Sequence, residues 1–205
     1  MKNFKTFIII LLSFFVVAFH AVSAQESATE QKIKDFVDNI GNKTISIIQN
    51  TSSTPKEKEE ILRQLFINTV DIKWIGDFVL GKYLHIFNDS QLTEYHDLYK
   101  QYLVSSYVPK FKQYTQESFK ITNINKRNNN EYIVYTVISK PNGQSIAVNY
   151  MIRANGNQLT VFDIIAEGIS LILTTRSDFT SIITNNNNQI EPLLKQLRNK
   201  IGVQN

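Results

Sequence analysis

The fold is decided by residues 131–166, EYIVYTVISKPNGQSIAVNYMIRANGNQLTVFDIIA, in which short β-prone runs alternate with turns. Asn142-Gly143 and Asn155-Gly156 each lie between two such runs, which is the strongest short-range signal for a β-hairpin. A further run precedes the stretch, separated from it by three asparagines at 128–130. The four runs are Ser118–Asn125, Glu131–Ser139, Gln144–Arg153 and Gln158–Ala166. We therefore predict a four-stranded antiparallel meander.

Apolar and polar side chains alternate in the third of these runs. The apolar positions are Ile146, Val148, Tyr150 and Ile152, with Ser145, Asn149 and Arg153 among the alternate positions. Because successive side chains of a strand point to opposite faces of its sheet, this pattern predicts a strand with one buried face.

Helical patterns precede and follow the predicted sheet. Thr54-Pro55-Lys56-Glu57 combines an N-cap threonine, a proline at the first helical position and a capping-box glutamate. Ser170 is placed to cap a later helix, and Gly81 to end an earlier one. Before the sheet, helices are expected over residues 25–50, from Pro55 past Phe66, over residues 70–80 and from Asp89 to about Tyr114, the last with a kink or end at Pro109. After the sheet, helices are expected over residues 171–183 and 189–200. Helices before and after an antiparallel sheet predict an α+β fold.

The first 24 residues have the three parts of a secretory signal peptide. Lys2 and Lys5 form a basic start, residues 7–19 are 13 apolar or small residues, and Val22-Ser23-Ala24 offers a cleavage site. An uncleaved membrane anchor is the competing interpretation, but 13 residues are about two-thirds of the roughly 20 that span a bilayer. We expect residues 1–24 to be removed and residues 25–205 to form one exported domain that is not membrane-integral.

Composition excludes several classes of protein. The 205 residues contain no cysteine, which rules out disulfides, cysteine nucleophiles and thiolate metal sites. Lys and Arg number 22 and Asp and Glu 18, and without the two lysines of the predicted signal peptide the balance is 20 to 18. A nucleic-acid-binding protein normally carries a concentrated basic footprint, so no nucleic-acid partner is expected.

Side chains that carry out catalysis are scarce. His85 and His96 are the only histidines after residue 24, and two histidines eleven residues apart are too few ligands for a metal site. The sequence has neither a G-x-S-x-G motif nor a phosphate-binding glycine loop. We expect Asp163 and Glu167 to pair with an arginine or to accept backbone hydrogen bonds. We predict no metal, no cofactor and no enzymatic activity.

Aromatic side chains crowd the region before the sheet. They are Trp74, Phe78, Tyr83, Tyr95, Tyr99, Tyr102, Tyr107, Phe111 and Tyr114. At helical spacing such residues usually form an ordinary core. Tyrosine, with an apolar ring and a polar tip, also suits the rim of an apolar cavity, and the pattern allows both interpretations.

Two stretches resemble the signatures of the MlaC (toluene-tolerance auxiliary) family. The first is Val70-Asp71 followed by Phe78-Val79-Leu80-Gly81-Lys82-Tyr83, and the second is residues 161–171, VFDIIAEGISL, trailed by Arg176 and Phe179. The tyrosine-rich helix and the Pro141-Asn142-Gly143 hairpin fall between them in the order typical of the family. The resemblance covers about residues 65–200.

The resemblance implies both a fold and a function. The fold would be a twisted four-stranded antiparallel sheet, like that of nuclear transport factor 2, wrapped by helices around an acyl-chain cavity. The function would be that of a periplasmic phospholipid carrier, with phospholipid as cargo and no chemistry performed. Its partners would be an outer-membrane lipoprotein–porin complex and an inner-membrane ABC lipid transporter complex, and its role the maintenance of outer-membrane lipid asymmetry.

A lipid carrier needs apolar walls, because transferring an acyl chain to water costs about 0.8 kcal/mol per methylene. The predicted wall residues are Trp74, Phe78, Val79, Tyr83, Tyr99, Leu103, Tyr107, Val148, Tyr150, Ile152, Ile164, Ile169 and Ile172. A basic cluster is either a solvated face or a docking surface for the partners. It consists of Lys110, Lys112, Lys120, Lys126 and Arg127.

Two other functions remain as alternatives. The same cone-shaped fold hosts isomerases that pair a carboxylate base with a tyrosine donor, for which Asp163 with Tyr135 or Tyr150 would be the candidates. A lipid-free envelope adaptor would bind envelope partners while holding no cargo. Lipid extracted from the purified protein would separate the carrier from the adaptor, and an activity assay would detect an isomerase.

Overall fold

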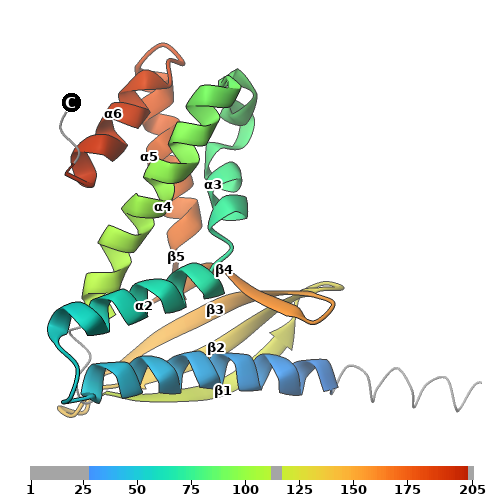
Figure 1. The fold of residues 1–205 in the computed structure, drawn as a ribbon. Helices are drawn as coiled ribbons and strands as arrows, with labels where there is room; N and C mark the ends of the chain where they lie inside the picture. Colours follow the sequence, from blue (N-terminus) through green and yellow to red (C-terminus); the bar gives the residue numbers. More distant parts are fainter. Residues whose placement is uncertain (1–27, 112–116, 203–205) are drawn as a thin grey trace, which may run out of the picture.

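The computed structural model describes residues 28–111 and 117–202. The elements, in chain order, are a helix over 28–49, α2 (Pro55–Thr69), α3 (Ile72–Leu80), the 3-10 helix η1 (Gly81–Ile86), α4 (Asp89–Phe111), β1 (Ser118–Lys126), β2 (Glu131–Ser139), β3 (Ser145–Asn155), β4 (Gln158–Ala166), β5 (Ile169–Ser170), α5 (Leu171–Asn185) and α6 (Glu191–Lys200). Figure 1 shows α3 to α6 standing together as a bundle above the sheet, with α2 and the helix over 28–49 lying across the sheet. The predicted α+β fold is confirmed. The predicted signal peptide, 1–24, and the predicted helix end near Tyr114 lie outside the described residues.

The sheet is an antiparallel meander in which β1 to β5 lie side by side in chain order. All four predicted strands are present, and their turns place Gly143 at φ 85° and Gly156 at φ 61°, which glycine adopts without strain. The sheet has one strand more than predicted. The additional strand, β5, is two residues long and pairs with the end of β4, and so short a strand leaves no alternating pattern in the sequence.

Two irregularities of register determine which side chains share a face of the sheet. One lies between Ile121 and Asn123 of β1, and the other lies between the pairs Met151–Asp163 and Ile152–Val161 of β3 and β4, where Phe162 of β4 is the extra residue. Met151 and Ile152 are both buried, in clusters on opposite faces. The prediction that this strand buries one face is therefore wrong for its second half. The reason is that Trp74 of α3 packs over the face that carries Met151.

Capping side chains set several helix boundaries where the sequence predicts them. Thr54 forms the capping box of α2, and the Ser170 side chain caps α5. α3 starts two residues later than predicted, because Val70 forms a parallel bridge with Val161 of β4. Pro109 lies inside α4. Local capping chemistry is thus readable from the sequence, whereas a long-range bridge is not.

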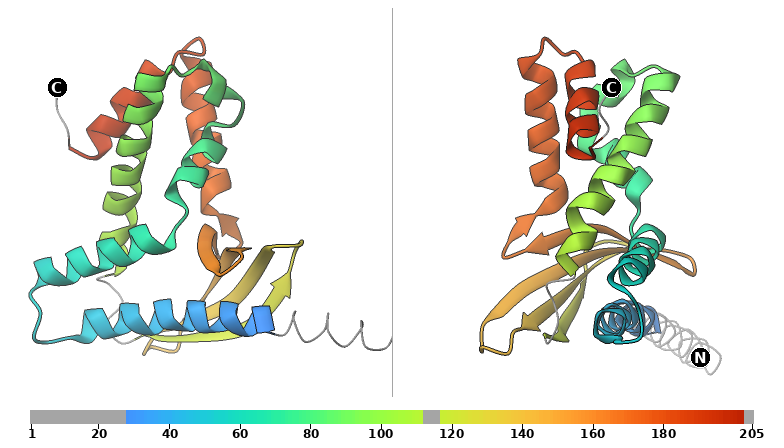
Figure 2. Two further views of the ribbon diagram at one scale, coloured as in Figure 1. Left: turned by 45° about the vertical axis from the view of Figure 1, so that its right-hand side comes forward. Right: turned by 60° about the vertical axis from the view of Figure 1, so that its left-hand side comes forward.

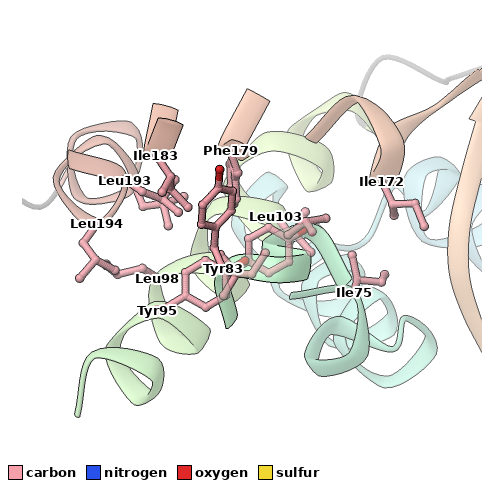
Figure 3. Close-up of a cluster of buried hydrophobic side chains, with 14 of the residues drawn as sticks. Ile75, Tyr83, Tyr95, Leu98, Leu103, Ile172, Phe179, Ile183, Leu193 and Leu194 are labelled. Carbon is pink, nitrogen blue, oxygen red and sulfur yellow. The ribbon is translucent and has the colours of Figure 1, made fainter. Parts of the chain in front are cut away.

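The helical bundle has a core of its own. Tyr95, Tyr99 and Phe179 pack ring against ring, with 5.6 Å between the centroids of Tyr95 and Tyr99 and 5.8 Å between those of Tyr99 and Phe179. The Tyr95 hydroxyl donates to the carbonyl of Gly76 at 3.0 Å. Leucines of α6 complete the core (Figure 3). Much of the aromatic crowding before the sheet is therefore ordinary core.

Candidate functional site

An apolar cavity lies between the sheet and the two N-terminal helices. Figure 2 shows the helix over 28–49 and α2 on the same side of the sheet. The cavity that these elements bound has a volume of about 310 Å³, near the lower end of the roughly 300–1,000 Å³ usual for small-molecule sites. The helices contribute Val37, Ile40, Gly41, Thr44, Ile45, Ile48, Leu62, Leu65, Phe66 and Thr69.

The sheet forms the wall opposite these helices. Besides Ser118, its lining side chains are Phe119, Ile138, Val148, Tyr150, Val161, Ile164 and Ala166. Val148 lies opposite Ala166, and two residues along the strand Tyr150 lies opposite Ile164. Since residues two apart on a strand point to the same face, the pairing of β3 with β4 produces a continuous apolar wall.

Gly41 allows the helix over 28–49 to approach the sheet closely. A Cβ atom at this position would lie 2.8 Å from the ring of Phe119, well inside the roughly 3.5–4.0 Å at which carbon atoms pack. Earlier in the same helix, Ile33 is fully buried in the cluster that it shares with the sheet. At the far end of the helix, Lys58 Nζ of α2 donates to the carbonyl of Ile48 at 2.7 Å. Helix, sheet and α2 are thus tied to one another around the cavity.

The charged groups of the cavity lining lie where α4 ends and β1 begins. Lys110 belongs to the last turn of α4, and Glu117 directly precedes β1. Lys110 Nζ lies 5.0 Å from the centroid of the Tyr107 ring, a cation–π distance. Tyr107 stacks on Phe66 of α2, with 6.4 Å between ring centroids. Burial raises the pKa of Tyr107, so its hydroxyl stays protonated at neutral pH.

Asp163 caps the turn that joins β4 to α5. Its Oδ1 accepts hydrogen bonds from the backbone N–H groups of Ile164 at 2.7 Å and Ile172 at 3.2 Å, and its Oδ2 accepts one from the Ser170 hydroxyl at 2.5 Å. Burial raises the pKa of Asp163, although these donors favour its charged form. The prediction that Asp163 accepts backbone hydrogen bonds is confirmed. Because both oxygens are engaged in capping, the geometry argues against Asp163 as the base of an isomerase.

The two signature stretches meet at the end of α3. Arg176 Nη1 donates to the carbonyl of Phe78 at 2.8 Å, and the guanidinium lies 4.8 Å from the centroid of the Phe78 ring. Gly81, at φ 53°, leaves room for this approach, since a Cβ there would lie 2.5 Å from Arg176 Nη2. Arg176 of the second stretch therefore caps the helix that the first stretch forms.

Four of the predicted wall residues line the cavity, namely Tyr107, Val148, Tyr150 and Ile164. The structure places the others elsewhere. Those in the bundle core are Val79, Tyr83, Tyr99, Leu103 and Ile172, with Trp74 and Phe78 packed against it. Ile152 is fully buried between the sheet and the helix over 28–49, whereas Ile169 is 62 % exposed. For the residues of α3, η1, α4 and α5, the physical reason is that these helices pack mainly against one another, and that Trp74 covers the sheet face carrying Met151 rather than the face that lines the cavity.

Sequence reasoning missed the helical wall of the cavity. The three-to-four spacing of residues such as Val37, Ile40 and Leu65 identifies two amphipathic helices. That spacing was the available signal, but it does not tell whether an apolar face covers a core or a cavity. The position of the two helices over the sheet supplies the missing information.

The predicted basic cluster is spread along β1 rather than gathered in one patch. Lys110 lies at the cavity, Lys120 and Lys126 are exposed on β1, and Arg127 follows the strand. At about 3.3 Å per residue, Lys120 and Lys126 are about 20 Å apart. Lys112 lies outside the described residues.

The described part of the chain holds neither a metal-binding cluster nor a membrane-spanning helix. Across residues 28–111 and 117–202, no three His, Asp or Glu side chains are grouped so as to hold a metal ion. His96 pairs with Asp77, with 2.7 Å between Nε2 and Oδ1. Among the helices of these same residues, none has both the length and the apolar composition needed to cross a bilayer.

Known proteins share this architecture. The sequence model of a family described as MlaC protein matches residues 23–199. Among solved structures, the chain is similar to the phospholipid-binding protein from Ralstonia solanacearum in complex with a phospholipid. The TM-score is 0.67 and the identity 16 %, over 84 % of this chain and 96 % of that chain. At this identity the likeness establishes the fold, a helix-wrapped antiparallel sheet.

Proposed function

Because the chain belongs to the MlaC family, we propose that it is a phospholipid carrier whose cavity holds acyl chains. The observation that carries the proposal is the cavity itself, with a continuous apolar wall and charged groups only where α4 ends and β1 begins. An amphiphile with apolar chains and a polar head matches this distribution. The phospholipid bound to the similar R. solanacearum protein supports the same class of ligand.

The carrier moves its cargo between two membranes. Two acyl chains of roughly 14–16 methylenes each would cost on the order of 20 kcal/mol or more in water, at about 0.8 kcal/mol per methylene. An apolar cavity lowers this cost for the part of each chain that it encloses, and the membrane partners impose the direction of exchange. The partners are an outer-membrane lipoprotein–porin complex and an inner-membrane ABC lipid transporter complex, and the exchange maintains outer-membrane lipid asymmetry. The signal peptide predicted over residues 1–24 supports export of the carrier to the periplasm.

The lipid-contact residues that we propose are Tyr107, Val148, Tyr150 and Ile164, together with the apolar side chains of α2 and of the helix over 28–49. Lipid extraction from the purified protein, followed by mass spectrometry, should recover phospholipid. Protein that is consistently empty and takes up no lipid from labelled vesicles would contradict the carrier function and favour a lipid-free adaptor.

Replacing Val148 by aspartate should sharply reduce the lipid content of the purified protein. A carboxylate in an apolar cavity costs several kcal/mol unless it is paired or neutralised. Ala147→Asp is the matched control, because Ala147 is exposed and points to the opposite face of the same strand. Phosphorus content per mole of folded protein measures the effect. Equal lipid content in the two variants would show that Val148 does not contact the bound lipid.

A further inference from the structure

Lys110 is the one basic side chain on the cavity wall within residues 28–111 and 117–202. Apart from Glu117, the remaining lining residues are apolar or carry only a hydroxyl group. A lysine at the boundary of an apolar cavity has an alkyl stem that packs on the wall and an ammonium that reaches water. Its place on this wall distinguishes Lys110 from the exposed lysines of the helices and of β1.

Aromatic packing holds the Lys110 ammonium at the cavity. Nζ lies 5.0 Å from the centroid of the Tyr107 ring, and Tyr107 is itself part of the wall. Tyr107 is in turn stacked on Phe66 of α2. Lys110 makes no ion pair with a carboxylate of the described residues, so its charge is available to a ligand.

We propose that Lys110 binds the phosphate group of a phospholipid whose acyl chains occupy the cavity. The inference rests on the proposed carrier function and adds the residue that recognises the polar part of the cargo. A lysine ammonium binds a phosphate as a point charge. The phosphodiester is common to zwitterionic and anionic phospholipids, so Lys110 selects phospholipids over lipids that lack phosphate rather than one head group over another.

The selectivity should be modest and dependent on salt. Lys110 is exposed, and Glu117 carries the opposite charge on the same part of the lining. Exposed ion pairs contribute less than buried ones because water and salt screen them. Removing the charge of Lys110 should reduce the selectivity about three- to tenfold. This loss lies between the contribution of an exposed ion pair and that of a buried hydrogen bond to a charged group.

Competition between two lipids tests the assignment. Phosphatidylglycerol and diacylglycerol with identical acyl chains displace a fluorescent fatty acid from the delipidated protein, and the ratio of their affinities is measured. Lys110→Met should lower the preference for phosphatidylglycerol about three- to tenfold and leave the affinity for diacylglycerol unchanged. Lys110→Arg should retain the preference for phosphatidylglycerol, because arginine keeps the positive charge. Lys100→Met is the matched control, because Lys100 is exposed on the same helix and does not line the cavity.

The results of this competition separate a failure of the role of Lys110 from a failure of the carrier function. An unchanged preference in Lys110→Met, with both lipids still bound, overturns the role of Lys110 and leaves the carrier function standing. If the wild-type protein binds neither lipid, the carrier function fails and this inference fails with it. Glycerol phosphate, which has no acyl chain, separates a lipid phosphate from a free one. If glycerol phosphate displaces the probe as effectively as phosphatidylglycerol does, Lys110 belongs to a site for free anions and the proposal is overturned.

Discussion

The turn at Gly81 and the connection between α5 and α6 adopt backbone conformations that few residues tolerate. Gly81 follows α3 with φ 53° and ψ −121°, a region that is essentially restricted to glycine. Asn187 and Asn188, in the connection between α5 and α6, have φ 56° and φ 58°. Asparagine tolerates this left-handed region better than most residues. The left-handed turn therefore explains two of the four asparagines at 185–188, Asn187 and Asn188.

Gly81→Ala should destabilise the protein. Backbone strain alone costs about 1–3 kcal/mol, and the new Cβ would in addition meet Arg176 Nη2 at 2.5 Å. Gly143→Ala is the matched control, because Gly143 has φ 85° but no atom within 4 Å of the corresponding Cβ position. Urea unfolding followed by circular dichroism measures both losses. Equal losses would mean that the approach of Arg176 does not require a glycine.

The cavity depends on how three elements are held against one another. The helix over 28–49 approaches β1 where Gly41 meets Phe119. α2 is shared between two parts of the molecule, since Leu62 and Phe66 belong to the bundle core and also line the cavity. A displacement of either helix therefore alters the volume that is available to a ligand.

Gly41→Ala should lower the lipid content of the protein. The added methyl group would displace either the helix or the Phe119 ring, and overpacking of this kind costs about 1–3 kcal/mol. Alanine also gains about 1 kcal/mol in helix propensity over glycine, so lipid content is a clearer measure than stability. Asn42→Ala, at the adjacent exposed position, is the control. Phe119→Leu in the Gly41→Ala background should restore lipid binding, and failure to do so would show that the contact is not responsible.

The whole molecule combines a sheet and two helices, which supply most of the cavity wall, with a bundle whose core is joined to that wall through α2. Its formal charge is small, and Lys120, Lys126 and Arg127 lie along or just after β1, an edge strand of the sheet. These three residues remain our candidates for docking to the membrane complexes, separate from Lys110. Complementary charge at such a surface accelerates encounter more than it strengthens binding.

Reversing Lys120, Lys126 and Arg127 to glutamate should slow lipid exchange with the purified membrane complexes, most at low ionic strength. Lipid content should stay unchanged, because none of the three lines the cavity. A triple reversal of Lys43, Lys56 and Lys100, all exposed on helices, matches the change in net charge. If lipid exchange slows equally in both triple variants, the change in net charge alone explains the effect. Lys120, Lys126 and Arg127 would then form a solvated face rather than a docking surface.

The sequence by itself determined the four long strands, most helix starts and the family. Each of these rests on neighbouring residues: alternation in β3, Asn-Gly turns, and caps such as Thr54 and Ser170. Only the tertiary structure decided which apolar faces leave space between them. Val148 and Tyr99 both fit the spacing of a buried position, yet Val148 faces the cavity while Tyr99 is buried in the bundle core. Periodicity specifies that a face is apolar, but what that face meets depends on contacts between elements that are distant in the chain.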